Sequence, residues 1–203
     1  MTLKIGYIPT ALPGFLTKAL RQFNEQYKHV CVQIDEMNPA HQKSALGRGA
    51  IDLALLGSAT PDWRKLYRVE NLRTVPVAIA LPDDHALSKK KAIDLSALAS
   101  EPFITLDEEV FPSRTPMQNS LFEQANIAPR IVLKARGLSE LLGHVGAGSG
   151  IALIPSDLDQ LPHDGVAIKP LKHQRYQLTF EAAWSEDQQT TELLALIELL
   201  KQQ

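Results

Sequence analysis

Short apolar segments with strand periodicity alternate with amphipathic segments of helical periodicity along the whole chain, and this alternation limits the possible folds most strongly. Residues 3–8 are typical of a strand, and apolar side chains at helical spacing follow in 15–27. Residues 30–36 alternate as a second strand does, and 51–56 form an almost continuous apolar run. A strand of that kind is covered on both faces, which is typical of parallel sheets in α/β proteins.

The same alternation returns in the second half with different residues. Strands are expected at 75–81, 103–106, 131–135 and 151–154, closing strands at 166–171 and 176–184, and helices at 115–125, 139–145 and 190–200. Thr115 with Pro116, and Ser139, are expected to begin their helices. The sequence therefore predicts two Rossmann-like α/β lobes. No Gly/Ser-rich or Pro-rich linker separates them near 81–84, so we expect two crossover strands to join them.

Composition excludes several classes of protein. Hydrophobic residues make up 44% of the 203 residues, which excludes disorder, and 21 basic against 23 acidic side chains lack the cationic excess of a nucleic-acid binder. No apolar run approaches the ~20 residues of a bilayer span, so we expect no membrane contact, and no signal peptide is expected at Met1. The single cysteine, Cys31, is expected to be a small buried strand residue.

Residues that suggest catalysis or cofactor chemistry have simpler explanations. The glycines at 146–150 follow a helix and precede a strand, which is the reverse of a phosphate-binding loop, so they predict a helix end and a tight turn. The six histidines have no metal-ligand spacing, and the acidic run 107–109 is typical of a solvated loop before a helix. No GxSxG nucleophile motif occurs. We expect no catalytic residues, no metal and no cofactor.

A binding site is expected where the strands end, because ligands of open α/β sheets lie beyond the carboxyl ends of the strands. Hydroxyls and helix starts gather there, and they favour a small carboxylate, with Arg114 as a possible partner. The same hydroxyls could equally serve as ordinary helix caps. The predicted ligand-binding residues are Pro9, Thr10, Ala11, Asn38, Pro39, Ser58, Thr105, Arg114, Leu138 and Ser139.

Seven segments in order resemble the effector-binding domain of LysR-type transcriptional regulators, which has the two-lobed fold of type 2 periplasmic binding proteins. The segments are LKIGYI at 3–8, LRQF at 20–23, GAIDLAL at 49–55, LPDDHAL at 81–87, EPFI at 101–104, PRIV at 129–132 and VGAGSGIALIP at 145–155. The resemblance covers nearly the whole chain. It implies a first lobe of residues 1–80 with 181–203 returning to it, a second lobe of 81–180, and a small-molecule inducer bound between them.

The resemblance also implies partners and a cellular setting. It implies a homodimer or homotetramer through helix 15–27 and strand 30–36, and DNA binding only through a winged helix-turn-helix that would precede this chain, in the cytoplasm. Thr10 falls where family members often present a hydroxyl to the effector carboxylate. Pro39 departs from the family, because many members have a second hydroxyl there, and proline offers neither a hydroxyl nor an N–H. This edge of the pocket is therefore expected to favour a less polar effector, such as an aromatic acid.

Two other functions fit the same scaffold. A solute-binding protein of a transporter would share the fold and would carry an export signal. An enzyme such as a dehydratase of the prephenate type would need an acid and base set that the sequence does not reveal. We expect an effector-sensing regulatory domain rather than either alternative.

Overall fold

The structure is a computed structural model that describes residues 1–11, 15–160, 164–172 and 177–203. The chain forms two compact units: unit 1 comprises Met1–Thr74 and Thr179–Gln203, and unit 2 comprises Val75–Leu178. The sequence placed the divisions near 80 and 180. The chain passes from one unit to the other inside two long strands, β4 (Arg68–Pro82) and β9 (Gln177–Trp184), so no loop marks the boundary.

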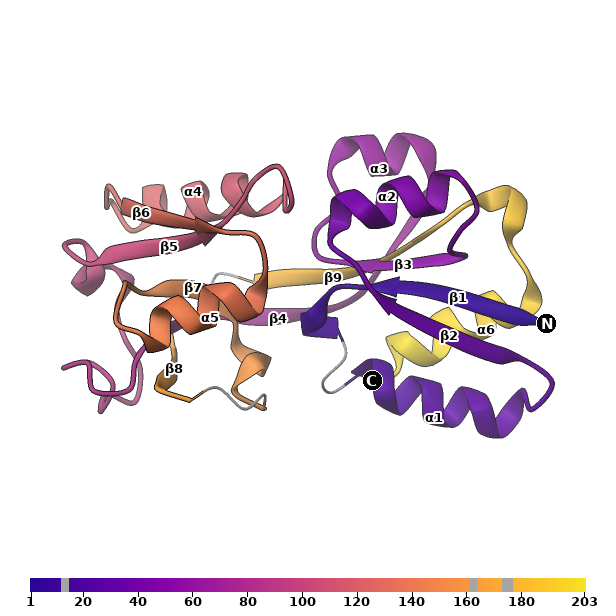
Figure 1. The fold of residues 1–203 in the computed structure, drawn as a ribbon, viewed down its shortest axis with the longest axis horizontal. Coiled ribbons are helices and arrows are strands. Elements are labelled where there is room, and N and C mark those ends of the chain that lie inside the picture. The colour runs from indigo at the N-terminus through magenta and orange to yellow at the C-terminus, as the bar shows by residue number, and fades with distance from the viewer. Residues whose placement is uncertain (12–14, 161–163, 173–176) are drawn as a thin grey trace. The chain divides into compact units, whose positions relative to one another are not determined.

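Unit 1 is a mixed sheet covered by helices on both faces. Strand β1 (Thr2–Tyr7) lies between β2 (Cys31–Glu36) and β3 (Leu53–Leu56) and is parallel to both, while β9 pairs antiparallel with β3. Helices α1 (Thr17–Gln26) and α6 (Thr191–Lys201) cover one face, and α2 (Pro39–Gly47) and α3 (Pro61–Leu66) cover the other (Figure 1). The predicted α/β class is therefore confirmed for this unit.

Local sequence explains how the elements of unit 1 begin and pack. Helix α6 is capped by Thr190, whose hydroxyl accepts a hydrogen bond from the Leu193 amide at 3.1 Å. Its buried face consists of Leu193, Leu196, Ile197 and Leu200, whereas the neighbouring Leu194 is 36% exposed. A helix turns by about 100° per residue, so Leu196 rather than Leu194 completes the stripe.

Unit 2, like unit 1, consists of strands that are followed by helices. Strand β5 (Pro102–Leu106) is parallel to β6 (Arg130–Ala135), and β7 (Ala152–Pro155) begins beside β5, where Ile104 and Pro102 exchange backbone hydrogen bonds of 2.8 Å with Ile151. The later part of β4 pairs antiparallel with β7 and with β8 (Val166–Pro170). Helices α4 (Arg114–Gln124) and α5 (Leu138–Gly146) follow β5 and β6.

The remaining helical turns are short and of the 3₁₀ type. They are η1 (Pro9–Ala11), η3 (Leu95–Leu98), η4 (Ser156–Gln160) and η5 (Glu186–Gln188). Asp94 caps η3, because its carboxylate accepts a hydrogen bond from the Ser96 amide at 3.1 Å. The predicted strand at 176–184 includes one residue, 176, that lies outside the described residues.

The glycine run forms the predicted helix end and turn rather than a phosphate loop. Gly148 has a φ of +77°, a left-handed conformation that favours glycine, and its amide bonds to the Val145 carbonyl at 2.9 Å. A Cβ on Gly150 would lie 2.6 Å from the carbonyl oxygen of Pro102. This position therefore needs glycine so that β7 can start beside β5.

Several local predictions were wrong. Helix α4 begins at Arg114 rather than Thr115, and its N-cap, Ser113, makes no side-chain bond to the helix. Helix α5 is preceded by extended Gly137, so Ser139 is its second residue and not its cap. Cys31 is exposed rather than buried, because β2 is the edge strand of its sheet and lacks cover from a further strand.

Candidate functional site

Unit 1 brings three predicted ligand residues to one edge of its sheet. Thr10 follows β1, Asn38 follows β2 and Ser58 follows β3. The three strands are parallel and hydrogen-bonded in the order β2, β1, β3, so their carboxyl ends share an edge. The Met37 amide donates to the Tyr7 carbonyl at 2.9 Å, which ties the exit of β2 to the end of β1. Thr10 therefore stands between the other two.

These three residues offer neutral hydrogen-bond donors. The hydroxyls of Thr10 and Ser58 make no side-chain hydrogen bond to any described residue, although Thr10 is 9% exposed. Asn38 caps α2 by accepting from the His41 amide at 2.9 Å through Oδ1, which leaves its NH₂ group available to donate. Pro39 is buried as the first residue of α2. Pro9 and Ala11 shape the turn η1, with Ala11 fully buried.

A buried glutamine fixes the loop that carries Asn38. Gln42 is fully buried, and its Nε2 donates to the Met37 carbonyl at 2.8 Å and to the Leu55 carbonyl at 3.2 Å. These two bonds connect the end of β2 with the end of β3 beneath the sheet edge. Its Oε1 is buried without a partner among the described residues. Gln42 therefore acts by positioning the loop.

A buried glutamate holds the loop that carries Ser58. Glu181 lies in β9 with a side chain only 6% exposed, and its carboxylate accepts hydrogen bonds from the Ala59 amide and from Nη2 of Arg64, both at 2.5 Å. The two contacts fasten the start of the β3–α3 connection to β9. Because the charge is both paired and hydrogen-bonded, its burial is tolerated.

Unit 2 gathers its predicted residues at the carboxyl edge of β6, β5 and β7. Leu138 begins α5 after β6 and is buried at 8% exposure, and Ser139 beside it is exposed. Arg114 begins α4 in the connection after β5, and its Nη2 donates to the Leu153 carbonyl of β7 at 2.9 Å. The Asp107 amide bonds to the Ala135 carbonyl at 2.8 Å, which joins the exits of β5 and β6.

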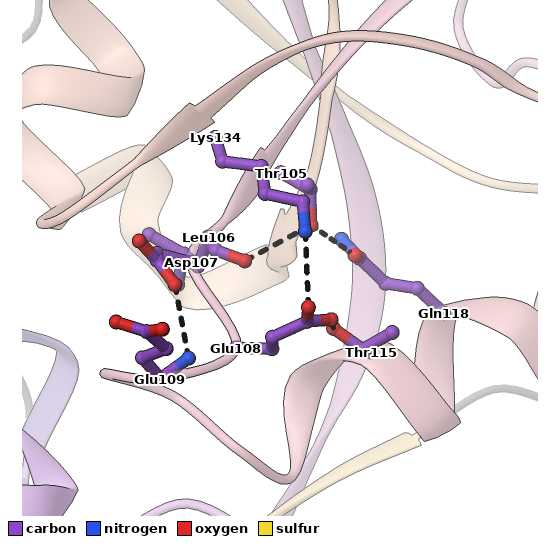
Figure 2. A network of polar contacts seen from close by, with 8 residues as sticks. All are labelled: Thr105, Leu106, Asp107, Glu108, Glu109, Thr115, Gln118 and Lys134. Carbon is purple, nitrogen blue, oxygen red and sulfur yellow. Dashed lines mark hydrogen bonds and ion pairs between the residues drawn. The ribbon is translucent and has the colours of Figure 1, made fainter.

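Figure 2 shows the polar network at this edge. Thr105 is buried, and its hydroxyl contacts Oε1 of Gln118 and lies 3.4 Å from the Leu106 carbonyl, so its single O–H is engaged inside unit 2. Glu108 pairs with Lys134 at 3.1 Å and accepts from the Thr115 hydroxyl at 3.4 Å. The Thr105 hydroxyl therefore does not donate to a ligand while it bonds to Gln118, and Glu108 of the acidic loop is bonded to Lys134 and Thr115.

Arg114 is unlike the paired arginines of this chain. Arg114 is half-buried, and burial lowers the pKa of its guanidinium to about 10, with no carboxylate of the described residues opposing that effect. Its Nε is buried and has no partner among the described residues. At neutral pH the group is still charged, because a pKa near 10 lies well above 7. The first turn of α4 carries no acidic residue, so the helix dipole adds further positive potential.

The described residues include neither a metal-binding group nor a membrane-spanning helix. No cluster of three or more His, Cys, Asp or Glu side chains is placed to hold a metal ion within the described part of the chain. None of the described helices is both long and apolar enough to cross a bilayer. A surface concavity of about 370 Å³ lies beside α2, lined by Met37, His41, Ser44 and Arg48, and it includes none of the predicted ligand residues.

The sequence analysis missed the residues that position the loops. Glu181 and Gln118 each bond to a partner that is distant in sequence or one helix away, so no local motif marks them. One signal was present, because Glu181 interrupts the apolar run from Phe180 to Trp184. A charge within an apolar strand indicates a buried pair.

A comparison with protein families matches the whole chain. The family model described as the LysR substrate binding domain matches residues 1–203. The HTH-type transcriptional regulator AlsR of Bacillus subtilis (strain 168) is 28% identical over 182 residues, which cover 90% of this chain and 58% of AlsR. The chain thus spans little more than half of that regulator's length.

Solved structures match the fold over nearly the full chain. The BenM effector binding domain with its effector benzoate has a TM-score of 0.83 at 22% identity and covers 99% of this chain and 90% of that one. The effector binding domain of QuiR in complex with shikimate has a TM-score of 0.84 at 17% identity and covers 100% and 96%. The α/β architecture is therefore that of a LysR-type effector-binding domain.

Proposed function

The chain belongs to the LysR substrate-binding domain family, and on that premise we propose that it is the effector-sensing part of a LysR-type transcriptional regulator. The observation that carries the proposal is the edge of unit 1, where Thr10, Asn38 and Ser58 follow three adjacent parallel strands with donors free of partners among the described residues. Neutral donors at the carboxyl edge of a sheet suit the oxygens of a small organic acid.

The proposed effector contacts in unit 1 are Pro9, Thr10, Ala11, Asn38, Pro39 and Ser58, and those in unit 2 are Thr105, Arg114, Leu138 and Ser139. We propose a carboxylate effector, aromatic or alicyclic, because the ligands named with the BenM and QuiR domains, benzoate and shikimate, are of that class. Many members of the family have a hydroxyl where this chain has Pro39. The apolar proline ring therefore favours an effector that is apolar on that side.

Effector binding would act on DNA indirectly. We propose that a DNA-binding segment outside residues 1–203 engages the operator in the cytoplasm, and that effector binding shifts the population of conformations of the regulator. No bond is made or broken in this scheme, so the domain has no catalytic role. The full-length gene product tests this point: a helix-turn-helix preceding this chain supports the regulator, and a secretion signal would instead support the solute-binding alternative.

The proposal for binding is tested by thermal unfolding of the chain with benzoate, shikimate and their neutral counterparts benzamide and methyl shikimate. A ligand present at about 100 times its dissociation constant adds about 2.7 kcal/mol to the free energy of unfolding. At about 2–4 °C per kcal/mol for a chain of this size, the expected rise in Tm is about 5–11 °C. If the protein is folded and neither benzoate nor shikimate raises its Tm, the proposal is contradicted.

We also propose a homodimer or homotetramer through helix 15–27 and strand 30–36. Strand β2 is an edge strand, and most of its side chains are exposed, including Ile34 at 38%. An exposed edge with an apolar residue is a natural pairing surface. Ile34→Glu is expected to reduce the mass measured by light scattering at a fixed concentration, whereas Leu66→Glu on α3, where the leucine is 64% exposed, is expected to leave it unchanged. Equal behaviour of the two variants would exclude this interface.

A further inference from the structure

A surface concavity beside α2 lies outside the proposed effector contacts. It measures about 370 Å³ and is lined by Met37, His41, Ser44 and Arg48. These residues recur at intervals of three or four positions, so they form one stripe along α2, from the residue before its N-cap to its C-cap. Ligand pockets begin at about 300 Å³, so a small molecule fits this space. Helix α2 covers the sheet face opposite α1, which separates the concavity from the α1 part of the proposed dimer surface (Figure 1).

Arg48 gives the concavity a cation that no carboxylate neutralises within the described part of the chain. Its Nη1 donates to Oγ of Ser44 at 2.8 Å, which holds the guanidinium along the stripe. A guanidinium has five N–H donors, and this exposed side chain forms no other bond with a described residue. Lys43, on the same helix, differs because it pairs with Asp62 at 3.6 Å. Arg48 therefore has accessible donors for a ligand.

The other side chains of the stripe complement Arg48. His41 is exposed, and its ring bonds to no described residue. The Ser44 hydroxyl accepts from Arg48, which leaves its own hydrogen to donate. Met37 is half-buried and offers a polarisable apolar surface. The concavity thus combines a guanidinium, an imidazole and a hydroxyl with a surface for the apolar part of a small molecule.

The charged side chains of α2 are all basic. Residues 39–48 contain His41, Lys43 and Arg48 and no aspartate or glutamate. Asp35 of the edge strand β2 lies level with Gly6 on the sheet face that α2 covers. It does not line the concavity, and it forms no ion pair with a described residue. The stripe is therefore a place of positive potential, which attracts an anion.

The number and kind of the donors favour a phosphate group over a carboxylate. A carboxylate presents two oxygens in one plane and is met by a single guanidinium edge. A phosphate monoester presents three terminal oxygens and a charge of about −1.5 to −2 at pH 7. Three donor side chains match the three oxygens, and they include one permanent cation and one imidazole that can take up a proton.

We propose that the α2 concavity is a second small-molecule site of unit 1, and that it binds the phosphate group of a small phosphorylated metabolite through Arg48, His41 and Ser44. The organic part of the ligand lies against Met37. This inference goes beyond the proposed function and does not depend on it, because none of the lining residues belongs to the proposed effector contacts.

The test titrates the ¹⁵N-labelled native chain with glycerol 3-phosphate at constant ionic strength, with glycerol and acetate as controls. Saturable shifts are expected at the backbone amides of Met37, His41, Ser44 and Arg48, and they are expected to persist when benzoate is present. Glycerol lacks the charge and acetate lacks the third oxygen, so neither is expected to saturate these shifts.

Two variants of α2 form a matched pair. Arg48→Gln removes the cation of the concavity and is expected to weaken glycerol 3-phosphate binding about tenfold, the value of one charge-assisted hydrogen bond. Because Arg48 is exposed, the Tm of this variant is expected to match that of the native chain. Lys43→Gln removes a cation of the same helix that does not line the concavity, and it is expected to change the affinity by less than about twofold.

Four results would overturn the inference. They are the absence of saturable shifts at the four lining amides, shifts that acetate reproduces, loss of the shifts in the presence of benzoate, and equal affinities of Arg48→Gln and Lys43→Gln. None of them bears on the proposed function, which fails instead if neither benzoate nor shikimate binds to the folded chain.

Discussion

Replacing Arg114 by methionine is expected to stabilise the ligand-free chain, which is unusual for the loss of a buried hydrogen-bonding residue. Burial lowers the pKa of Arg114 to about 10. At about 1.4 kcal/mol per pKa unit, this lowering corresponds to a penalty between about 3 and 4 kcal/mol on the charged folded state. The variant also loses the bond to the Leu153 carbonyl, and a bond from a charged group contributes about 1.5–3 kcal/mol.

Subtracting the lost hydrogen bond from the removed burial penalty leaves a net gain in the free energy of unfolding of about 0.5–2 kcal/mol. This gain corresponds to a rise in Tm of about 1–8 °C. The sign of the pH dependence follows from the lowered pKa. Between about pH 10 and the higher pKa of an arginine in the unfolded chain, the unfolded chain binds the proton and the folded chain does not, so stability rises with pH only in that window. Below about pH 10 the guanidinium is charged in both states, so the free-energy penalty of burying it does not change with pH. The difference in Tm between the variant and the native chain should therefore not change from pH 6 to pH 8.

Arg64→Met is the matched control, because it removes the same charge from an arginine that has a partner. Glu181 would keep only the Ala59 amide as its contact. An unpaired buried carboxylate is costly, so a loss of about 1–3 kcal/mol is expected, reduced by the exposure of Arg64. Thermal and urea unfolding of both variants measure whether each substitution raises or lowers the free energy of unfolding. If Arg114→Met is as destabilising as Arg64→Met, the guanidinium of Arg114 is a structural group and not an uncompensated charge.

Three further variants test other parts of the structure. Thr10→Val should weaken benzoate or shikimate binding in calorimetry by about 2- to 12-fold, the value of one neutral hydrogen bond, with Tm unchanged; full affinity would remove Thr10 from the site. Glu181→Gln should lower the free energy of unfolding, measured in urea, by about 1–2 kcal/mol and should weaken effector binding, because the charge that pairs with Arg64 is lost. If the variant matches the native chain in stability and in affinity, the ion pair does not fix the loop that carries Ser58. Gly150→Ala should cost about 1–3 kcal/mol in urea unfolding, because the new Cβ would lie 2.6 Å from the Pro102 oxygen, whereas Gly143→Ala in α5, with open space around it, should not destabilise.

Periodicity predicted most of the fold because it reflects burial directly. The run ending in Leu53–Leu56 is a fully buried strand, and the segment 15–27 contains helix α1. Helix α3 was missed because Trp63 is the only buried residue among its six, so no stripe is visible. The first half of β4 was missed for a related reason, since charged residues of Arg68–Arg73 leave only Leu72 buried.

The candidate site was predictable in position more than in chemistry. Strand ends alone pointed to Thr10, Asn38 and Ser58, because parallel strands end at a common edge. The partners of each side chain could not be predicted, since they come from distant segments. Thr105 carries a hydroxyl in the right place, yet Gln118 of α4 engages it. Arg114 was expected to face a ligand, but its unpartnered Nε became visible only when β7 was placed against α4.

The most direct test of effector sensing is to titrate ¹⁵N-labelled chain with benzoate and with shikimate and to follow the backbone amide resonances. Binding as proposed predicts saturable shifts that concentrate at Thr10, Asn38, Ser58, Arg114 and Leu138. Shifts that stay absent at saturating ligand, or that gather instead at the α2 concavity around His41 and Arg48, would contradict it.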